Sequence, residues 1–213
     1  MFIPGWLVIA ALTQPSAKPV TTHRAYVQAS LFASIRPAGS TLSNGRIDQN
    51  LGGTTAALSV SGGVWVSHSL GVEGEFVYAG SVTAPQVYNY GFALHYTAES
   101  QQMLLDALMR FRPTGTAAFE VVAGGGWGRN TDRETSVVEV HPPSQQVAQP
   151  DQALTRDALT LMGGTDFPLR VGAHVAIVPG VRFRWLKPLP DNVYLIGGTS
   201  SWTIEFGAGV RIQ

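Results

Sequence analysis

The residues of this chain with the most chemical potential are charged side chains that alternate with apolar ones. They comprise five acids and five arginines: Glu73, Glu75, Asp106, Glu120, Glu205, Arg110, Arg156, Arg182, Arg184 and Arg211. A strand sends alternate side chains to opposite faces, so each is expected on the face opposite its apolar neighbours. Balanced signs in a narrow space favour ion pairs, because a planar guanidinium can bridge two carboxylates. The pattern predicts lumen ion pairs inside a barrel.

The positions of these charges along their strands predict two layers of charge in the lumen. Counting residues along each strand places one set near the inner end of the barrel and the other set nearer its outer end. The inner set is Glu73, Arg110 and Glu120, and the outer set is Arg156, Arg182 and Glu205.

The histidines give no sign of a metal or catalytic site. They lie in separate segments without metal-ligand spacing: His23, His68, His95, His141 and His174. His174 falls inside an alternating segment and is expected to be a hydrogen-bonded lumen residue. The glycine run at 124–128 is followed by no helical pattern, so it does not predict a phosphate loop. The absence of cysteine excludes disulfide bonds and thiol catalysis. We expect no catalytic residue, metal or cofactor.

The segment Val171–Trp185 gives the clearest secondary-structure signal. One of its faces is apolar throughout, and the other is small in the middle and carries two arginines. Seven further segments alternate in a similar way: Ala25–Ile35, Ala56–Ser67, Leu70–Tyr78, Gln101–Phe111, Ala117–Trp127, Leu154–Gly164 and Trp202–Ile212. Segments of roughly ten residues suit tilted strands that cross a membrane.

The connections between these segments alternate in length. The short ones are Ser67–Ser69, Arg112–Gly115 and Thr165–Arg170, and the long ones are Arg36–Gly53, Ala79–Glu99, Gly128–Asp151 and Lys187–Ser200. This order predicts an all-β fold, an up-and-down eight-stranded antiparallel transmembrane β-barrel with short periplasmic turns and long external loops.

Composition and aromatic positions agree with a membrane barrel. Charged residues make up 13% of the chain, about half the 25% typical of soluble domains. The net charge of zero gives no general attraction for nucleic acid. Aromatic residues of the apolar faces are expected to form an interfacial girdle, with Tyr78, Trp127, Trp185 and Trp202 at the outer rim and Phe111 and Phe119 at the inner rim.

Two further features concern the polar face. Trp65 alternates in step with the polar side chains of its segment and is expected either at a bulge or as a lumen plug. Four glycines lie on the same face, where they are expected to make room for long lumen side chains, to bend the strands, or to do both. They are Gly124, Gly126, Gly207 and Gly209.

The N-terminal run Trp6–Leu12 is apolar and too short to cross a bilayer as a helix. Followed by polar and small residues, it predicts a signal peptide over 1–17, cleaved after Ala17, or alternatively after Ala10 or Ala11. The barrel domain is then expected over 24–213.

The chain resembles the small outer-membrane β-barrel family of the OmpA-like transmembrane type. The resemblance rests on Leu70–Tyr78 (LGVEGEFVY), Val122–Gly128 (VAGGGWG) and Leu161–Val181 (LMGGTDFPLRVGAHVAIVPGV). It implies a monomer in the bacterial outer membrane that contacts its lipids and the barrel-assembly machinery. It also implies a structural or surface-binding role, with a ligand held by the external loops. The chain departs from the family in ending with Gln213 instead of phenylalanine, and no peptidoglycan-binding domain is expected.

Two alternatives remain open from the sequence. An outer-membrane lipid A deacylase-like hydrolase is suggested by His95-Tyr96-Thr97-Ala98 and Glu99, although threonine replaces the serine of that motif. His68-Ser69 falls in a tight turn, where a hydroxyl more often caps the turn. The second alternative is a soluble lipocalin-like carrier of a small ligand, with an apolar interior and a polar surface.

Overall fold

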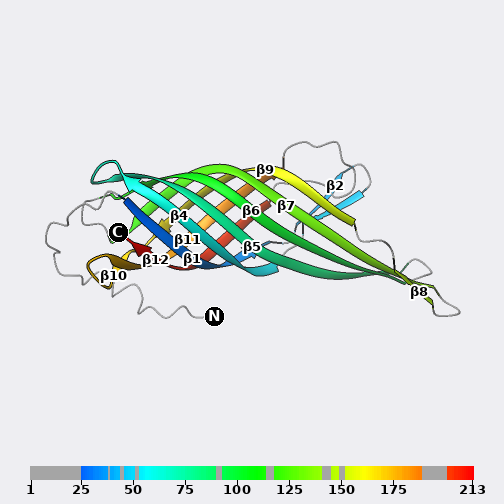
Figure 1. Cartoon of the computed structure of the whole chain (residues 1–213). Helices are drawn as coiled ribbons and strands as arrows, with labels where there is room; N and C mark the ends of the chain where they lie inside the picture. The colour runs from blue at the N-terminus through cyan, green and yellow to red at the C-terminus, as the bar shows by residue number, and fades with distance from the viewer. Residues whose placement is uncertain are drawn as a thin grey trace.

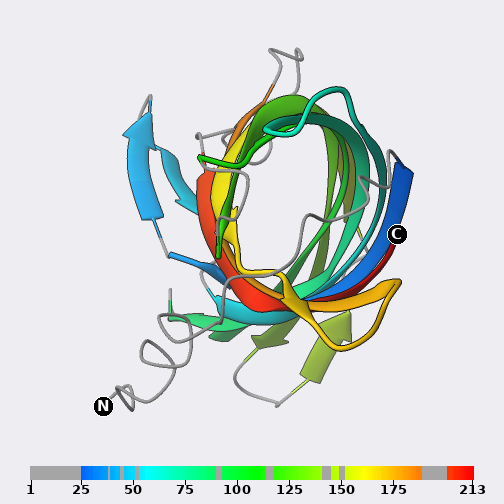
Figure 2. The same cartoon turned by 90° about the vertical axis from the view of Figure 1, so that its left-hand side faces the viewer.

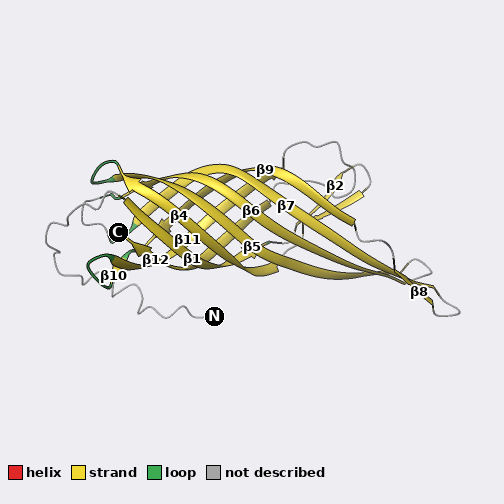
Figure 3. Cartoon of the chain, in the orientation of Figure 1, coloured by secondary structure: helices red, strands yellow, loops and turns green. Residues whose placement is uncertain are grey.

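The computed structural model describes residues 25–37, 39–43, 46–50, 53–89, 93–113, 118–140, 145–148, 152–188 and 201–213. These residues form strands and turns (Figure 3). The strands are β1 (Ala25–Arg36), β2 (Gly39–Ser43), β3 (Arg46–Asn50), β4 (Gly53–Trp65), β5 (Leu70–Asn89), β6 (Ala93–Phe111), β7 (Glu120–Val140), β8 (Gln145–Ala148), β9 (Gln152–Asp166), β10 (Leu169–Arg170), β11 (Val175–Pro188) and β12 (Ser201–Ile212). Within the described ranges, no helix is long and apolar enough to cross a membrane.

Eight long strands close into a barrel (Figure 2). Each of β1, β4, β5, β6, β7, β9, β11 and β12 pairs antiparallel with its neighbours in this order, and β12 pairs with β1 to close the ring. The predicted up-and-down eight-stranded antiparallel barrel is confirmed. The predicted leader over 1–17 lies outside the described residues.

The strands are strongly staggered around the barrel. The row of Cα partners that begins at Val64 on β4 runs through β5, β6, β7, β9, β11, β12 and β1 and returns to β4 at Thr54. The return is therefore offset by ten residues along β4. A stagger of this kind requires strands that tilt steeply against the barrel axis.

Burial alternates along most of the described length of the barrel strands, as on β1, where exposed and buried residues follow one another. The inward residues include buried arginines and carboxylates, and the outward ones are large hydrophobic side chains such as Leu31, Leu58 and Leu161, each at least 56% exposed. A lipocalin-like barrel has the opposite distribution, so the structure contradicts that alternative.

One end of the barrel, here called the extended end, carries longer strands than the sequence suggests (Figure 1). We predicted irregular loops at Ala79–Glu99 and Gly128–Asp151, but β5 and β6 stay paired as far as Asn89 and Ala93. β7 continues to Val140, pairs with β6 throughout and contacts β8 near its end. These loop predictions were wrong, since the polar segments continue the ladder beyond the apolar band. Within Arg36–Gly53, β2 and β3 form a hairpin.

The opposite end, here called the turn end, has short connections, and the C-terminus also lies there (Figure 1). β11 begins at Val175, because residues 172–174 form a bend, so the predicted strand start at Val171 is wrong. β9 extends to Asp166, inside the predicted turn Thr165–Arg170. β10 pairs with β11 in the same register as β9 does. Phe167 and Pro168 lie between β9 and β10 and interrupt the ladder. Proline cannot donate to the ladder, which accounts for the interruption.

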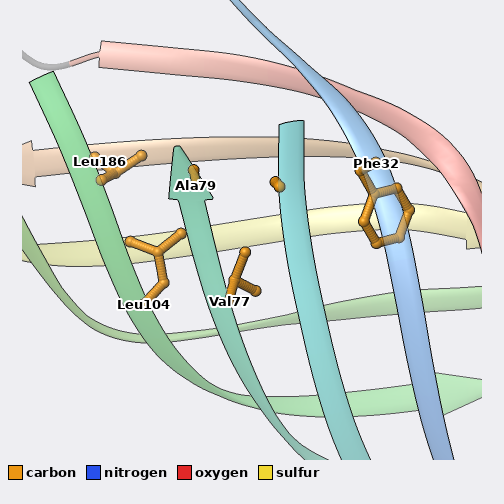
Figure 4. Close-up of a cluster of buried hydrophobic side chains, with 6 residues drawn as sticks. Phe32, Val77, Ala79, Leu104 and Leu186 are labelled. Carbon is orange, nitrogen blue, oxygen red and sulfur yellow. The ribbon is translucent and has the colours of Figure 1, made fainter. Parts of the chain in front are cut away.

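The lumen also contains an apolar layer near the extended end (Figure 4). Its buried members are Phe32, Ala57, Val77, Ala79, Leu104 and Leu186. On β5 the inward residues run Glu73, Glu75, Val77 and Ala79, so the charged layer lies closer to the turn end than the apolar layer does.

Candidate functional site: a buried ion-pair network in the lumen

Arg110 on β6 connects three carboxylates near the turn end. Its Nε and Nη2 donate to the two oxygens of Glu73, the second at 3.1 Å. Its Nη1 donates to Glu120 Oε2 at 3.1 Å and to Asp166 Oδ2 at 2.5 Å. The Tyr26 hydroxyl donates to Glu73 Oε2 at 2.5 Å. One guanidinium therefore links β5, β7 and β9 across the lumen.

Glu120 accepts hydrogen bonds from two further arginines. Arg211 Nη1 lies 3.0 and 2.9 Å from its two oxygens, and Arg112 donates through Nε and Nη2 at 2.9 and 2.8 Å. Arg211 Nε also donates to Gln28 Oε1 at 2.8 Å. Glu120 is fully buried, whereas the Arg112 side chain is 19% exposed. Arg112 therefore lies where the network meets the mouth at the turn end.

A second group of pairs continues toward the extended end. Glu75 accepts from Arg182 and from Arg184, the latter at 3.2 Å. Arg184 also donates to Asp106, which accepts from the Thr160 hydroxyl as well. Arg182 Nη2 donates to Asp166 Oδ2 at 3.4 Å, which joins this group to the Arg110 group. The two groups form one continuous network, here called the lumen network.

Glu205 has a looser place in the lumen network. Arg184 Nε lies 3.5 Å from Glu205 Oε1, and Glu205 Oε2 is buried without a hydrogen-bond partner among the described residues. A buried polar atom without a partner is costly, so Glu205 is held less completely than the other carboxylates of the lumen network.

Aromatic rings pack against the guanidinium groups of the lumen network. Arg112 lies over the Trp65 ring, with 3.6 Å from its Cζ to the ring centroid. Arg211 lies 4.9 Å from the Tyr26 centroid, and Arg182 lies 4.9 Å from that of Phe32. Trp65 is an inward residue of β4 and is 6% exposed, so of the two predicted roles it has that of a lumen side chain.

Nine of the ten charged residues predicted from the sequence are buried in the lumen network: Glu73, Glu75, Asp106, Arg110, Glu120, Arg182, Arg184, Glu205 and Arg211. Arg156 is half-buried near the start of β9, opposite Asn130 on β7. Two members of the predicted outer group, Arg182 and Glu205, are direct Cα partners on β11 and β12. Arg182 reaches Glu75 across the lumen, because the stagger brings β5 and β11 charges together.

Sequence reasoning missed two members of the lumen network, Asp166 and Arg112. Both had been assigned to turns, at Thr165–Arg170 and Arg112–Gly115. Asp166 contacts three arginines, the third being Arg211 at 3.9 Å. A signal existed, since Asp166 keeps the inward parity of Thr160 and Met162.

The histidine predictions have mixed outcomes. His174 was expected in the lumen but is exposed in the bend before β11, where its Nδ1 lies 3.1 Å from the Gln213 oxygen. At the β4–β5 turn, the Ser67 hydroxyl accepts from the amides of Ser69 and Leu70 at 3.2 and 3.0 Å. That turn is therefore built from local hydrogen bonds, and the neighbouring His68 is exposed.

The side chains of the deacylase-like motif, His95, Tyr96, Thr97 and Ala98, lie outside the described residues, as do His23 and His141. Among the described residues, no group of histidine and acidic side chains could hold a metal ion.

The predicted girdle residues lie on the outward faces. Four are well exposed: Phe111, Phe119, Trp127 and Trp202. Tyr78 and Trp185 are partly covered. Trp202 stacks on Phe183 with 5.7 Å between ring centroids, and Gln101 donates to the Tyr78 hydroxyl.

In the lumen network the buried charges neutralise one another, and no reactive group is presented to solvent. Its arginines and carboxylates are paired side chains with 0–2% exposure, apart from Arg112. Removing one partner of such a solvent-free ion pair leaves an uncompensated buried charge.

Comparisons with known proteins agree with this architecture. No family model matches the chain, and no curated protein matches it in sequence. The structure is similar to Ail, the attachment invasion locus protein of Yersinia pestis, with a TM-score of 0.50 and 11% identity over 89% of this chain and 98% of Ail. The fold is thus that of the small eight-stranded outer-membrane barrels.

Two other solved barrels are also similar. OprG from Pseudomonas aeruginosa has a TM-score of 0.47 and 14% identity over 91% of this chain and 98% of its own. Neisserial surface protein A has a TM-score of 0.41 and 18% identity over 88% and 96%.

Proposed function

We propose that this chain is a bacterial outer-membrane protein that spans the bilayer as a closed barrel with its lumen plugged by side chains. Its role is structural or surface-binding, and the strands of the extended end form the interaction surface. One observation carries the proposal: charged residues are buried inside while large hydrophobic residues cover the outside. In water this arrangement exposes a large apolar surface, whereas in a bilayer the same surface lies against acyl chains.

The reach of the arginines supports the proposed plug. Arg110, Arg182 and Arg184 extend from β6 and β11 to carboxylates on other strands, and their side chains have no solvent exposure. An eight-stranded barrel is just wide enough for side chains to fill its interior. The apolar layer around Leu104 and Leu186 adds a second barrier to ions beside the charged one.

The binding role rests on the shape of the extended end. β5, β6 and β7 continue as a paired sheet beyond the residues where β1 and β11 end. A sheet that projects from a rigid barrel presents a surface for recognition.

The experiment compares gel mobility and conductance of the purified full chain. A folded barrel is expected to change mobility when boiled, and to give no steady current in planar bilayers. A large, ohmic conductance from a heat-modifiable protein would contradict the plug. An absence of any mobility shift in the outer-membrane fraction would contradict the membrane barrel itself.

A further inference from the structure

Three outward-facing cations gather at one part of the barrel surface. Among the described barrel strands, the outward arginines and lysine are Arg129 and Arg133 on β7 and Lys187 on β11. All three are exposed, and all lie toward the extended end. Other outward positions in the middle of the barrel wall are apolar or small. The three cations therefore mark the edge of the apolar surface on this side of the barrel.

Arg129 and Lys187 flank the tryptophans of the girdle. Trp127 on β7, Leu159 on β9 and Lys187 on β11 are Cα partners in one row across the three strands. Arg129 pairs with Asp157 in the next row toward the extended end. Since adjacent strands lie about 4.8 Å apart, Trp127 and Lys187 are separated by about 10 Å. We call Trp127, Arg129, Asp157, Leu159 and Lys187 the cationic patch.

The geometry of Arg129 fixes its guanidinium. Its Cζ lies 5.0 Å from the Trp127 ring centroid. Its Nε lies 3.1 Å from Asp157 Oδ1, and the two side chains are 48% and 40% exposed. The terminal nitrogens make no hydrogen bond with the described residues, and Lys187 makes no ion pair with them. Arg129 is thus already paired with one carboxylate through Nε, while its terminal nitrogens and the Lys187 ammonium can still bind an anion from outside the chain.

We propose that the cationic patch binds the phosphate groups of a phosphorylated membrane lipid on the outer surface of the bilayer. This rests on the proposed membrane location. Tryptophans favour the headgroup level of a bilayer, and the patch cations lie in or next to the row of Trp127. A guanidinium binds phosphate through two nitrogens, while an ammonium acts as a point charge. Leu159, 50% exposed, lies between the cations and contacts the acyl region.

A simpler explanation is that both side chains only keep their charge near water. In that case the binding of lipid to the protein does not depend on phosphate. Changing the lipid and changing the protein are therefore two independent tests of phosphate binding.

The test titrates the full chain in detergent with rough lipopolysaccharide, and separately with its dephosphorylated form, and follows binding by native mass spectrometry. The double variant Arg129→Gln/Lys187→Gln should bind the phosphorylated lipid at least about tenfold more weakly, or about 1.4 kcal/mol. Removal of the phosphates should weaken wild-type binding to the same extent. Arg170→Gln, an exposed cation at the turn end, is the matched control and should bind like the wild type.

Two results would overturn the inference: equal binding by the double variant, or equal binding of dephosphorylated lipid. The lipid comparison uses wild-type protein, so it holds even if the variant fails to fold. Heat-modifiability of the wild type is measured alongside. If heat-modifiability is absent, the proposed membrane barrel is contradicted. If it is present but lipid binding shows no phosphate selectivity, only the proposed phosphate site is contradicted.

Discussion

At the scale of single residues, Arg110 shows how the lumen charges depend on one another. It contacts Glu73, Glu120 and Asp166 without solvent exposure. Removing a guanidinium from such a site leaves carboxylates buried without their main partner. Breaking a buried pair in this way costs more than the pair contributes when both members are present.

We therefore predict that Arg110→Met lowers the free energy of unfolding in lipid vesicles by about 3–5 kcal/mol. Adding Glu73→Gln should recover part of the loss, because one uncompensated carboxylate disappears. A double-mutant cycle from urea unfolding measures this coupling, expected at about 0.5–3 kcal/mol. Strict additivity of the two changes would contradict a coupled pair.

Sequence alone predicted which residues face the lumen better than it predicted their partners. The parity of Glu75 and Arg182 follows from alternation, but their contact depends on a stagger of ten residues that no local pattern contains. Asp166 was missed because the turn was predicted to begin at Thr165, whereas β9 continues to Asp166. Strand parity is local information, whereas pairing across a barrel is global.

At the scale of elements, the lumen-side glycines mark close approaches between neighbouring strands. A Cβ at Gly126 on β7 would lie 2.8 Å from the Asp106 Cα on β6, so the backbone itself would have to shift. Close approach of the neighbouring backbone is thus a further reason for glycine here, beside the two roles expected from the sequence. By contrast, a Cβ at Gly74 on the outside of β5 would meet nothing within 4 Å.

This contrast predicts different costs for the same substitution. Gly126→Ala should destabilise the barrel by about 1–3 kcal/mol, because the added methyl group overpacks against backbone. Gly74→Ala is the matched control and should be neutral or stabilising, since alanine restricts the unfolded chain. Unfolding midpoints in urea measure both, and equal effects would mean that backbone crowding is not the cause.

The lengths of the strands were less predictable than their existence. Alternation of apolar and polar residues identifies a strand only where one face contacts lipid or core. Beyond Trp127, β7 carries polar residues such as Arg129, Asn130 and Thr131 on both faces, so the pattern ends although the ladder continues. The hydrogen bonds of the backbone, which any sequence can make, extend the sheet there.

The extension itself can be tested with proline. Thr131 on β7 pairs with Gln101 on β6 and Thr155 on β9. Thr131→Pro removes a ladder donor, so amide protection should fall around the partner that accepts from the Thr131 amide, while the barrel remains heat-modifiable. Hydrogen exchange measures this, with Thr131→Val as the control that keeps the amide. Unchanged protection at both partners would count against the paired extension.

At the scale of the whole molecule, the barrel has an inverted distribution of polarity that only a bilayer can accommodate. Val181 lies in the middle of β11, is 50% exposed, and pairs with Phe206. Val66 is 60% exposed in the turn between β4 and β5. In water the two positions are equivalent exposed valines, but in a membrane they lie at different depths.

Arginine at these two positions distinguishes the environments. Val181→Arg should cost about 2–4 kcal/mol of folding free energy in phospholipid vesicles, and Val66→Arg only about 0–1 kcal/mol, since the penalty falls toward the interface. Neither variant removes an ion pair of the lumen network, so the difference reports depth in the bilayer. Urea unfolding of both variants in vesicles measures it. Equal costs would place both valines in the same solvent, and the barrel wall would then not cross the hydrocarbon.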